Sequence, residues 1–356
     1  MSSYILSFMK ILPHGSFINI SAPFISPGSD IPILLTAFTG TAAFEIGGMT
    51  LHSALGFNMS SGKNYVPLQG KKLNTFRTYL SKLLLLVIDE ISMVGADFFY
   101  HVHRRLEEIT GNTQTPFGGI SILAVGDFYQ LPPVAQQFIF KEPSDPYAKL
   151  YGSLWTQHFK LVELTESMRQ KDDEVFGQLL MRVRTGNCTQ EDMSKLDSRI
   201  VSEHDPSYPL DALHVFTTNK EVDAHNLCHL SKFQNIFEFK SIDKRKDVNT
   251  GQMNVIFSKK SSETGGLRDT IMICVGARIM LTKNIDVSDG LVNGVLGTVV
   301  AFDGSDKNSI KSILVAFDSD RVGKMAIQKS TFKYMYPNAV PINRLECCFS
   351  VGKKVH

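Results

Sequence analysis

The stretch Leu83–Val94, with the sequence LLLLVIDEISMV, decides how the first part of this 356-residue chain folds. Six apolar residues run without a break into two adjacent carboxylates, Asp89 and Glu90. An apolar run of this length is typical of a strand buried on both faces of a parallel sheet. Open α/β sheets bind ligands at the carboxyl ends of their strands, which is where the two acids stand. The stretch therefore predicts either a ligand-binding edge or a buried strand whose acids merely begin a surface loop.

Two further short apolar runs lie before and after this strand in the sequence. Ile33–Thr36 leads into Thr39 and Gly40, where we expect a turn before a helix. Ile120–Val125 ends two residues before another acid, Asp127. Short apolar strands joined by helical segments predict a parallel α/β layer. Two of the three strands would then bring carboxylates to the same edge.

Helical spacing marks the segments that should cover this sheet. Gly95–Ile109 places its large apolar residues on one stripe, so we expect the charged and histidine side chains off that stripe to be exposed. Residues 172–184 show a second amphipathic pattern, and Asn219–Leu230 should form a third helix. The residues expected to be exposed in the first pattern are His101, His103, Arg104 and Arg105, and those expected to face inward in the second are Val175, Phe176, Leu179, Leu180 and Val183.

The remaining segments differ in the secondary structure that their residue patterns predict. Residues 1–30 contain three spaced prolines, and we expect most of them to be irregular. Leu161–Leu164 and Ala212–Thr217 have the pattern of short strands. From Ile271 onward, short alternating strands separated by Gly and Asn turns predict a small antiparallel barrel or sheet.

Composition sets broad limits on the class of protein. With 356 residues, of which 43% are hydrophobic, the chain is long enough for two domains with sizeable cores. Its formal net charge of +2 carries no strong nucleic-acid signal. The five cysteines form no C-x-x-C pair, and their odd number favours a reducing compartment over a disulfide framework. No run approaches the roughly 18 apolar residues of a membrane span.

One group of residues has the spacing of metal ligands. His225 and His229 flank Cys228 at helical spacing. A histidine pair of this kind without a glutamate and a third ligand is a weak metal signal. We therefore expect a solvated helix at this position.

Asp89, Glu90, Asp127 and Gln130 can be treated as one site. Hydrolysis of a nucleoside triphosphate requires Mg²⁺, a positioned water and groups that sense the γ-phosphate, and these side chains can supply those parts. Arg169 could reach across as an arginine finger, because a planar guanidinium suits phosphate oxygens. The alternative for Arg169 is a surface ion pair with a nearby acid. The three carboxylates alone would also suit a two-metal nuclease, in which Gln130 and Arg169 have no role.

Longer blocks of the sequence resemble the PIF-type (petite integration frequency) DNA helicases, in the RecD-like branch of superfamily one. The blocks follow the family's order over most of Ile33–Asp303, and GDFYQLPPV with ESMRQ downstream is highly specific. The matching text is LLTAFTGTAAFEIGGMTLHSAL, VIDEISMVGADFF, PFGGISILAVGDFYQLPPV, LTESMRQKDDEVFGQLLMRVRTG, TTNKEVDAHN and VGARIMLTKNIDVSDGLVNGVLGTV.

The resemblance implies an α/β fold with tandem RecA-like parallel-sheet domains and a small SH-three-like β insertion. The first RecA-like domain would occupy residues 1–150, the N-terminal part of the second residues 151–270, and the β-rich insertion residues 271–356. The first domain is expected to be truncated at its N-terminus and the second to be incomplete.

The resemblance also implies an activity and its partners. Family members use ATP and Mg²⁺ to step 5′→3′ along single-stranded DNA and to separate duplex DNA in repair, recombination and telomere maintenance. We accordingly expect ATP and Mg²⁺ as cofactors, single-stranded and duplex DNA as partners, a monomer, no membrane association and a nuclear location, with the mitochondrion as the alternative.

Carried over residue by residue, the resemblance assigns roles around the nucleotide. Asp89 would bind Mg²⁺, and Glu90 would be the catalytic base. Gln130 would contact the γ-phosphate and couple it to DNA, and Arg169 would be the finger from the second RecA-like domain.

The resemblance assigns DNA contacts to a second set of residues. Thr39, Gly40 and His52 fall in the segment that contacts single-stranded DNA in the family. There the backbone grips phosphate, which agrees with binding that has no sequence preference.

The sequence departs from the family pattern in two places. No G-x-x-x-x-G-K-[ST] precedes residue 33, and none of the Gly-Lys pairs in the chain is followed by Ser or Thr. No block like T-I-H-K-S-Q-G follows the β-rich segment. Without the phosphate loop, most of the grip on the β- and γ-phosphates is lost. We therefore expect an internal piece of a helicase that hydrolyses ATP poorly by itself, the alternative being a DNA-binding fragment or a relic of a Helitron-type transposon.

Overall fold

The computed structural model describes residues 6–9, 31–57, 64–164, 169–202, 204–209, 212–246, 253–256, 268–304 and 309–345. Its contacts divide the chain into two compact units, Met1–Leu210 and Asp211–His356. The division into residues 1–150, 151–270 and 271–356 that the resemblance implies stays a prediction.

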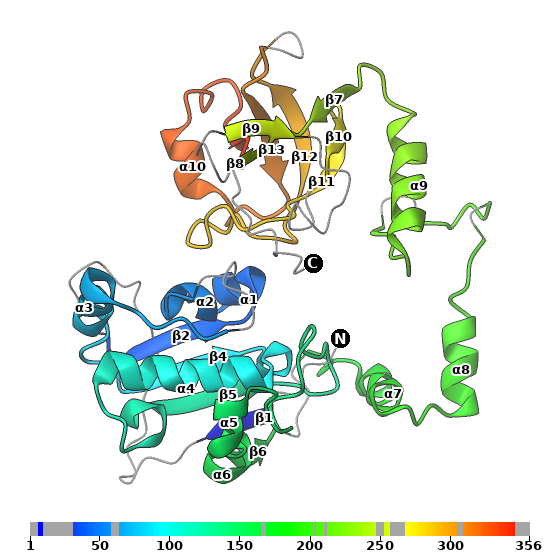
Figure 1. Cartoon of the computed structure of the whole chain (residues 1–356). Helices are drawn as coiled ribbons and strands as arrows, with labels where there is room; N and C mark the ends of the chain where they lie inside the picture. The colour runs from blue at the N-terminus through cyan, green and yellow to red at the C-terminus, as the bar shows by residue number, and fades with distance from the viewer. Residues whose placement is uncertain are drawn as a thin grey trace. The chain divides into compact units, whose positions relative to one another are not determined.

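A six-stranded sheet forms the centre of the first unit (Figure 1). Strands β2, β3, β4 and β5 are mutually parallel, as the buried apolar runs predict. The order across the sheet is β3-β2-β4-β5-β1-β6. The strands are β1 (Leu6–Met9), β2 (Ile33–Ala37), β3 (Met49–Thr50), β4 (Leu85–Asp89), β5 (Ser121–Gly126) and β6 (Lys160–Glu163).

Two strands of this sheet come from segments that the sequence pattern placed elsewhere. Leu6–Met9, within the start of the chain that was expected to be mostly irregular, pairs antiparallel with both β5 and β6. The predicted strand at Leu161–Leu164 is present as β6, and it belongs to the same sheet as β4. A long-range pairing of this kind leaves no local signal in the sequence, so only the folded chain shows it.

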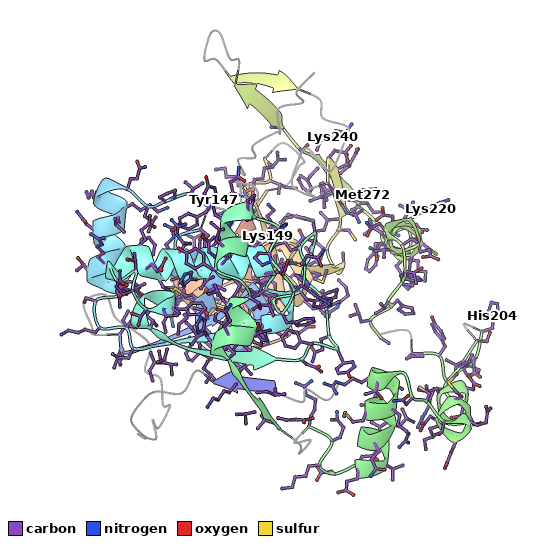
Figure 2. The ribbon with its side chains drawn as sticks, turned by 60° about the horizontal axis from the view of Figure 1, so that its bottom comes forward. Tyr147, Lys149, His204, Lys220, Lys240 and Met272 are labelled. Carbon is purple, nitrogen blue, oxygen red and sulfur yellow. The ribbon has the colours of Figure 1, made fainter. Side chains whose placement is uncertain are left out.

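Helices flank the sheet and close its core. The helix α4 lies over the sheet (Figure 1), and Val102 and Leu106 pack with Leu86 and Ile88 in one buried cluster. Short helices can also show a clear inner and outer face: on α5, Ala148 is buried, whereas Tyr147 is 71% exposed and projects outward (Figure 2). The helices of the first unit are α1 (Gly40–Glu45), α2 (Leu51–Ala54), α3 (Gly70–Tyr79), α4 (Ala96–Thr110), α5 (Pro146–Leu150), α6 (Leu154–His158), α7 (Glu174–Thr185) and α8 (Gln190–Asp197).

The prediction that the polar side chains of α4 are exposed is wrong for three of them. His101, His103 and Arg105 are only 7%, 2% and 2% exposed, whereas Arg104 is partly exposed. The polar face of the helix is covered by neighbouring segments that make hydrogen bonds to it. Arg105 donates to the carbonyl oxygen of Val66 over 2.8 Å and pairs with Glu108 over 2.9 Å.

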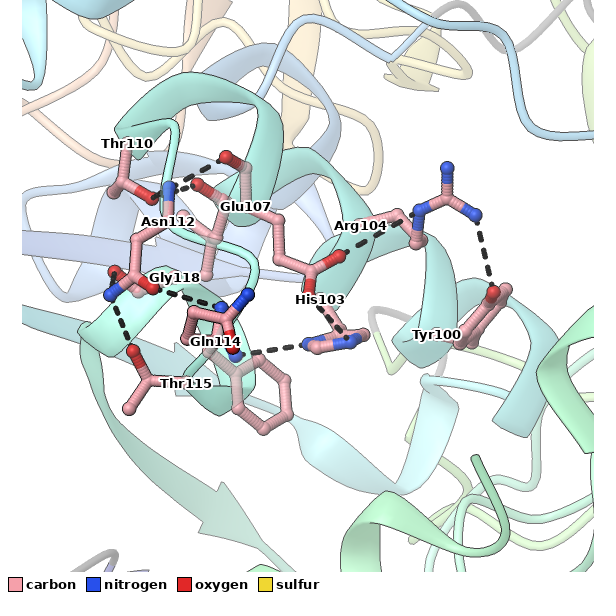
Figure 3. A network of polar contacts seen from close by, with 11 residues as sticks. Tyr100, His103, Arg104, Glu107, Thr110, Asn112, Gln114, Thr115 and Gly118 are labelled. Atoms are coloured by element: carbon pink, nitrogen blue, oxygen red, sulfur yellow. Dashed lines mark hydrogen bonds and ion pairs between the residues drawn. The ribbon is translucent and has the colours of Figure 1, made fainter. Parts of the chain in front are cut away.

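A polar network around His103 and Arg104 covers another part of this helix (Figure 3). The N–H of Phe117 donates to Nδ1 of His103 over 2.9 Å, so a neutral imidazole carries its proton on Nε2. That nitrogen faces Glu107 at 3.4 Å. Burial raises the pKa of Glu107, and Arg104 partly offsets this effect. Hydrogen bonding thus allows polar side chains to stand where the helical pattern predicts an exposed face.

The inward residues predicted for residues 172–184 are mostly not inward. Leu179 is buried, but Val175 is 76% exposed, and Phe176 and Val183 are exposed as well. The strand predicted over Ala212–Thr217 is also absent from that stretch. Among the described residues, no second parallel sheet is present for these segments to cover. The apolar side chains of these segments are therefore largely uncovered, with the exception of Leu179.

The second unit confirms the antiparallel strands predicted from Ile271 onward. Strands β11, β12, β13 and β14 form a four-stranded antiparallel sheet, and two strand pairs, β7 with β10 and β8 with β9, are also antiparallel. The elements are α9 (Asn219–Leu230), β7 (Phe237–Lys240), β8 (Asp243–Lys246), β9 (Met253–Ile256), β10 (Thr270–Ile273), β11 (Arg278–Met280), β12 (Leu296–Phe302), β13 (Ser312–Phe317), α10 (Lys324–Lys329) and β14 (Ala339–Asn343). Over the described ranges, the model contains no helix with the length and apolarity needed to cross a bilayer.

Replacing Glu108 tests how much the buried charges of α4 contribute to stability. Its carboxylate accepts hydrogen bonds from Arg105, from the hydroxyl of Tyr65 and from the N–H of Leu68. Glu108→Ala leaves the Arg105 guanidinium buried without its counter-charge, and we expect it to lower the free energy of unfolding by about 3–5 kcal/mol in urea titrations. Lys71→Ala, on the exposed α3, serves as control and should change it by at most about 0.5 kcal/mol. Equal effects of the two substitutions would contradict this account.

Candidate functional site

Strand register brings the chemically interesting residues to one edge of the first unit. Ala37, at the end of β2, stands opposite both Asp89, at the end of β4, and Thr50, at the end of β3. Ile88 pairs with Ala124, so β5 also reaches its carboxyl end here. The residues that follow these strands therefore share one edge, as the sequence predicts.

Glu90 occupies a strained backbone position directly after β4. Its φ and ψ of 55° and 46° lie in the left-handed region, and its N–H donates to Oδ1 of Asp89 over 2.9 Å. This conformation costs a residue with a side chain about 1–2 kcal/mol relative to the right-handed one. Strain of this kind is characteristic of functional sites, where the surrounding fold holds a side chain in a set direction. The turn therefore fixes the directions of the two adjacent acids.

A glycine allows β5 to approach this turn. A Cβ atom on Gly126 would lie 2.9 Å from the backbone nitrogen of Ile91, directly after Glu90. Any larger residue would push the two segments apart. The close approach brings Asp127, the next residue, near enough for its charge to raise the pKa of Glu90.

The three carboxylates of this edge have two kinds of environment. Burial raises the pKa of Asp89 and, together with the charges of Asp89 and Asp127, the pKa of Glu90. A divalent cation bound at Asp89, beside Glu90, would relieve this unfavourable charge density. Mg²⁺ commonly uses one or two carboxylates and completes its shell with water and phosphate oxygens, so the donor set fits it.

Asp127 is held by several hydrogen bonds and organises the turn that carries Gln130. Its side chain is 2% exposed and accepts from the N–H of Tyr129 over 3.0 Å and from the Gln130 amide over 3.5 Å. Its carbonyl oxygen accepts from the N–H of Gln130 over 2.9 Å. Gln130 itself is exposed. A buried carboxylate thus fixes an exposed amide at the edge that carries the acids.

Sequence reasoning missed the arginine that binds Asp127. Arg184, near the end of α7, donates from Nε and Nη2 to the two carboxylate oxygens over 2.9 and 2.7 Å. Its guanidinium also lies 4.3 Å from the centre of the Tyr129 ring. Burial opposes ionisation of Asp127, but the hydrogen bonds from Arg184 and Tyr129 outweigh it and lower the pKa. No spacing rule connects residues this far apart, and two arginines in the last turn of a helix suggest only a favourable interaction with the helix dipole.

Arg169, the predicted arginine finger, lies in an exposed turn before α7. Its role toward a phosphate stays a prediction. The arginine whose hydrogen bonds to an acid of this edge are described is Arg184.

The predicted DNA-contact residues lie just after β2 and β3. The side chain of Thr39 caps α1 by accepting from the N–H of Ala42 over 3.2 Å, and Gly40 begins that helix. His52, on α2, stacks on Phe98 with ring centres 4.5 Å apart, and burial lowers its pKa. The structure thus brings all three residues near the edge of the acids, and their contact with DNA stays a prediction.

His52 also borders an aromatic cavity. The cavity has a volume of about 360 Å³ and includes Phe57, Tyr65 and Arg105 in its lining. The Arg105 guanidinium lies 4.8 Å from the ring centre of Phe57 and 5.2 Å from that of Tyr65.

The histidines predicted to lie on a solvated helix are on α9 of the second unit. The rings of His225 and His229 lie 4.5 Å apart, and His214 lies 4.5 Å from His225. Within the described ranges, no group of three or more His, Cys, Asp or Glu side chains is arranged to hold a metal by itself.

Comparisons with known proteins identify relatives of this chain. Residues 22–194 match the model described as PIF1-like helicase, and residues 270–302 match the DNA helicase Pif1 2B domain. The chain is similar to the ATP-dependent DNA helicase PIF1 of Emericella nidulans, with 36% identity over 76% of this chain and 35% of the relative. With the ATP-dependent DNA helicase PIF1 of Xenopus laevis, identity is 31% over 77% of this chain and 41% of the relative. The chain therefore spans well under half the length of these relatives.

Solved structures show the same fold. A Pif1 helicase from Bacteroides in complex with ADP-AlF3 and ssDNA aligns with a TM-score of 0.58 and 28% identity, over 82% of this chain and 64% of that one. A Pif1 helicase from Candida albicans aligns with a TM-score of 0.55 and 28% identity, over 80% of this chain and 65% of that one. The predicted α/β, RecA-like fold is thereby confirmed.

The left-handed position of Glu90 predicts that removing its side chain stabilises the fold. Glu90→Gly and Glu90→Gln both remove a charge, but only glycine also removes the backbone strain. We expect Glu90→Gly to be more stable to urea than Glu90→Gln by about 1 kcal/mol at neutral pH. A Glu90→Gly variant less stable than Glu90→Gln would show that the turn is not strained.

The opposite pKa shifts of Glu90 and Asp127 predict opposite pH dependences. Because the folded-state pKa of Glu90 is raised, its carboxylate destabilises the fold at neutral pH, and this effect disappears as the pH falls through that pKa. Glu90→Gln should therefore be more stable than the wild type at neutral pH, by a margin that shrinks toward acid pH. The pKa of Asp127 is lowered, so Asp127→Asn should instead be less stable at neutral pH, by a margin that shrinks as acid protonates the wild-type carboxylate. Thermal unfolding between about pH 2 and 8 measures both margins, because the lowered pKa of Asp127 places its titration below the ordinary carboxyl range. Margins of the same sign at neutral pH would contradict the assignment.

Proposed function

Because the chain belongs to the PIF1-like helicase family, we propose that it is an ATP-dependent DNA helicase that steps 5′→3′ along single-stranded DNA and separates duplexes. The observation that carries the proposal is the shared strand edge, where Asp89 and Glu90 stand at the end of β4 and the Asp127–Gln130 turn follows β5. This arrangement provides acids for a metal-bound phosphate and an amide beside them.

The proposed chemistry assigns one task to each side chain. Asp89 would hold Mg²⁺, which when bound neutralises charge on the phosphates. Glu90 would orient the attacking water and accept its proton, and its raised pKa makes it a better base than an ordinary carboxylate. Gln130 would contact the γ-phosphate, and Arg169 would contribute positive charge from beyond the first sheet.

The DNA strand is proposed to contact the segments that follow β2 and β3. Thr39, Gly40 and His52 would contact it there, mainly through phosphates and without sequence preference. With a formal net charge of only +2, we expect modest affinity that weakens strongly with salt. Nuclear location, with the mitochondrion as the alternative, roles in repair, recombination and telomere maintenance, and a monomeric state belong to the same proposal.

A second candidate function is a DNA-binding piece with impaired catalysis, either a helicase fragment or a relic of a Helitron-type transposon. The observation that favours it is that no G-x-x-x-x-G-K-[ST] occurs in the 356 residues. Loss of transition-state contacts of the kind made by that loop costs about 10²-fold or more in rate.

Steady-state ATP hydrolysis by the purified 356-residue chain decides between the two functions. For the helicase, we expect Mg²⁺-dependent turnover that single-stranded DNA stimulates. Glu90→Gln should lower this turnover by at least about 100-fold, because the water loses its proton acceptor. Glu142→Gln, at an exposed position, is the control and should keep full turnover.

The other outcomes are equally distinct. Binding of single-stranded DNA without turnover, and without a change of affinity on adding ATP, would establish the DNA-binding piece. DNA cleavage with Mg²⁺ and no ATP would instead identify a two-metal nuclease using Asp89, Glu90 and Asp127.

A further inference from the structure

The ion pair between Arg184 and Asp127 joins two parts of the chain that the proposed function treats separately. Asp127 follows β5 and begins the turn of Gln130, whereas Arg184 lies on α7, beyond β6. The two carboxylate oxygens accept from Nε and Nη2 at 2.9 and 2.7 Å. The side chains are only 17% and 2% exposed, so solvent screens the pair weakly.

Arg184 restricts this turn through two contacts. A bidentate guanidinium–carboxylate pair fixes both the distance and the plane of the partner, unlike a pair made by a lysine. The same guanidinium lies over the Tyr129 ring at 4.3 Å, one residue before Gln130. Arg184 also lowers the pKa of Asp127, whose carboxylate accepts the hydrogen bonds of Tyr129 and Gln130 as well. Removal of Arg184 would therefore loosen the turn and not merely one ion pair.

We propose that Arg184 is a positioning residue for γ-phosphate sensing, which acts by holding Asp127 and Tyr129 so that Gln130 is presented in a fixed direction. The inference rests on the proposed function of Gln130. It adds a residue outside the predicted set and links α7 to the turn that carries Gln130.

The same helix contains a matched control. Arg182, two residues earlier, makes a bidentate pair with Asp192 of α8, with both distances at 2.6 Å. Asp192 is 3% exposed, so this pair resembles that of Arg184 in chemistry and in the burial of its acid. It makes no contact with the Asp127–Gln130 turn among the hydrogen bonds of the described residues. A purely structural ion pair on α7 should behave like Arg182.

The first measurement is ATP turnover by the full chain with saturating single-stranded DNA. We expect Arg184→Gln to lower kcat by about 10- to 100-fold while KM for ATP changes less than about threefold. A misplaced Gln130 would weaken contacts to the transition state more than it weakens binding of ATP in the ground state. Arg184→Lys keeps the charge but not the fork, and should fall between the wild type and Arg184→Gln. Arg182→Gln should keep the wild-type kcat.

The second measurement is hydrogen–deuterium exchange without nucleotide, which does not depend on turnover. We expect the amides of Tyr129 and Gln130 to exchange at least about tenfold faster in Arg184→Gln and unchanged in Arg182→Gln, since only the first variant releases Asp127. If wild-type turnover is absent, the proposed function fails, and exchange alone decides whether Arg184 holds the turn. Equal exchange in the two variants, or a wild-type kcat in Arg184→Gln, would overturn the inference.

Discussion

The parallel pairing of β2, β4 and β5 is the constraint on which the rest of the first unit depends. Leu34, Leu86 and Ile122 are almost fully buried, so the register of these strands is set by the need to keep them in the core. Once that register is fixed, Asp89 lies opposite Ala37 whether or not the acid contributes to stability. Burial of apolar side chains thereby determines where the polar residues after each strand meet.

The edge that results is locally unfavourable. Glu90 has a left-handed backbone, and the charges of Asp89 and Asp127 raise its pKa. Gly126 is required because nothing larger fits against Ile91. The large core beside this edge offsets these costs. Backbone strain and like charges that are concentrated at one place of a stable fold are characteristic of a functional site, where the residues are selected for chemistry and not for stability.

Buried arginines tie the peripheral segments to this core in the same physical way. Arg105 binds Glu108 and the carbonyl oxygen of Val66, and so fixes the chain before α3 against α4. Arg184 binds Asp127 and so fixes α7 to the end of β5. In each case the guanidinium bonds to a group far along the chain, Val66 or Asp127, and low exposure keeps the ion pair from being screened. Charged side chains thus contribute long-range contacts that the apolar pattern does not record.

The sequence by itself determined the buried parallel strands, the acids at their ends, the helices α4 and α9 and the antiparallel strands of the second unit. These follow from apolar periodicity and turn residues, which act over a few neighbouring positions. Only the tertiary structure decided that Leu6–Met9 joins the sheet, that His103 and Arg105 are buried, and that Arg184 binds Asp127. Each of these depends on a partner far along the chain. Local pattern states whether a residue is apolar or charged, but the folded chain decides which distant hydrogen-bonding group it meets.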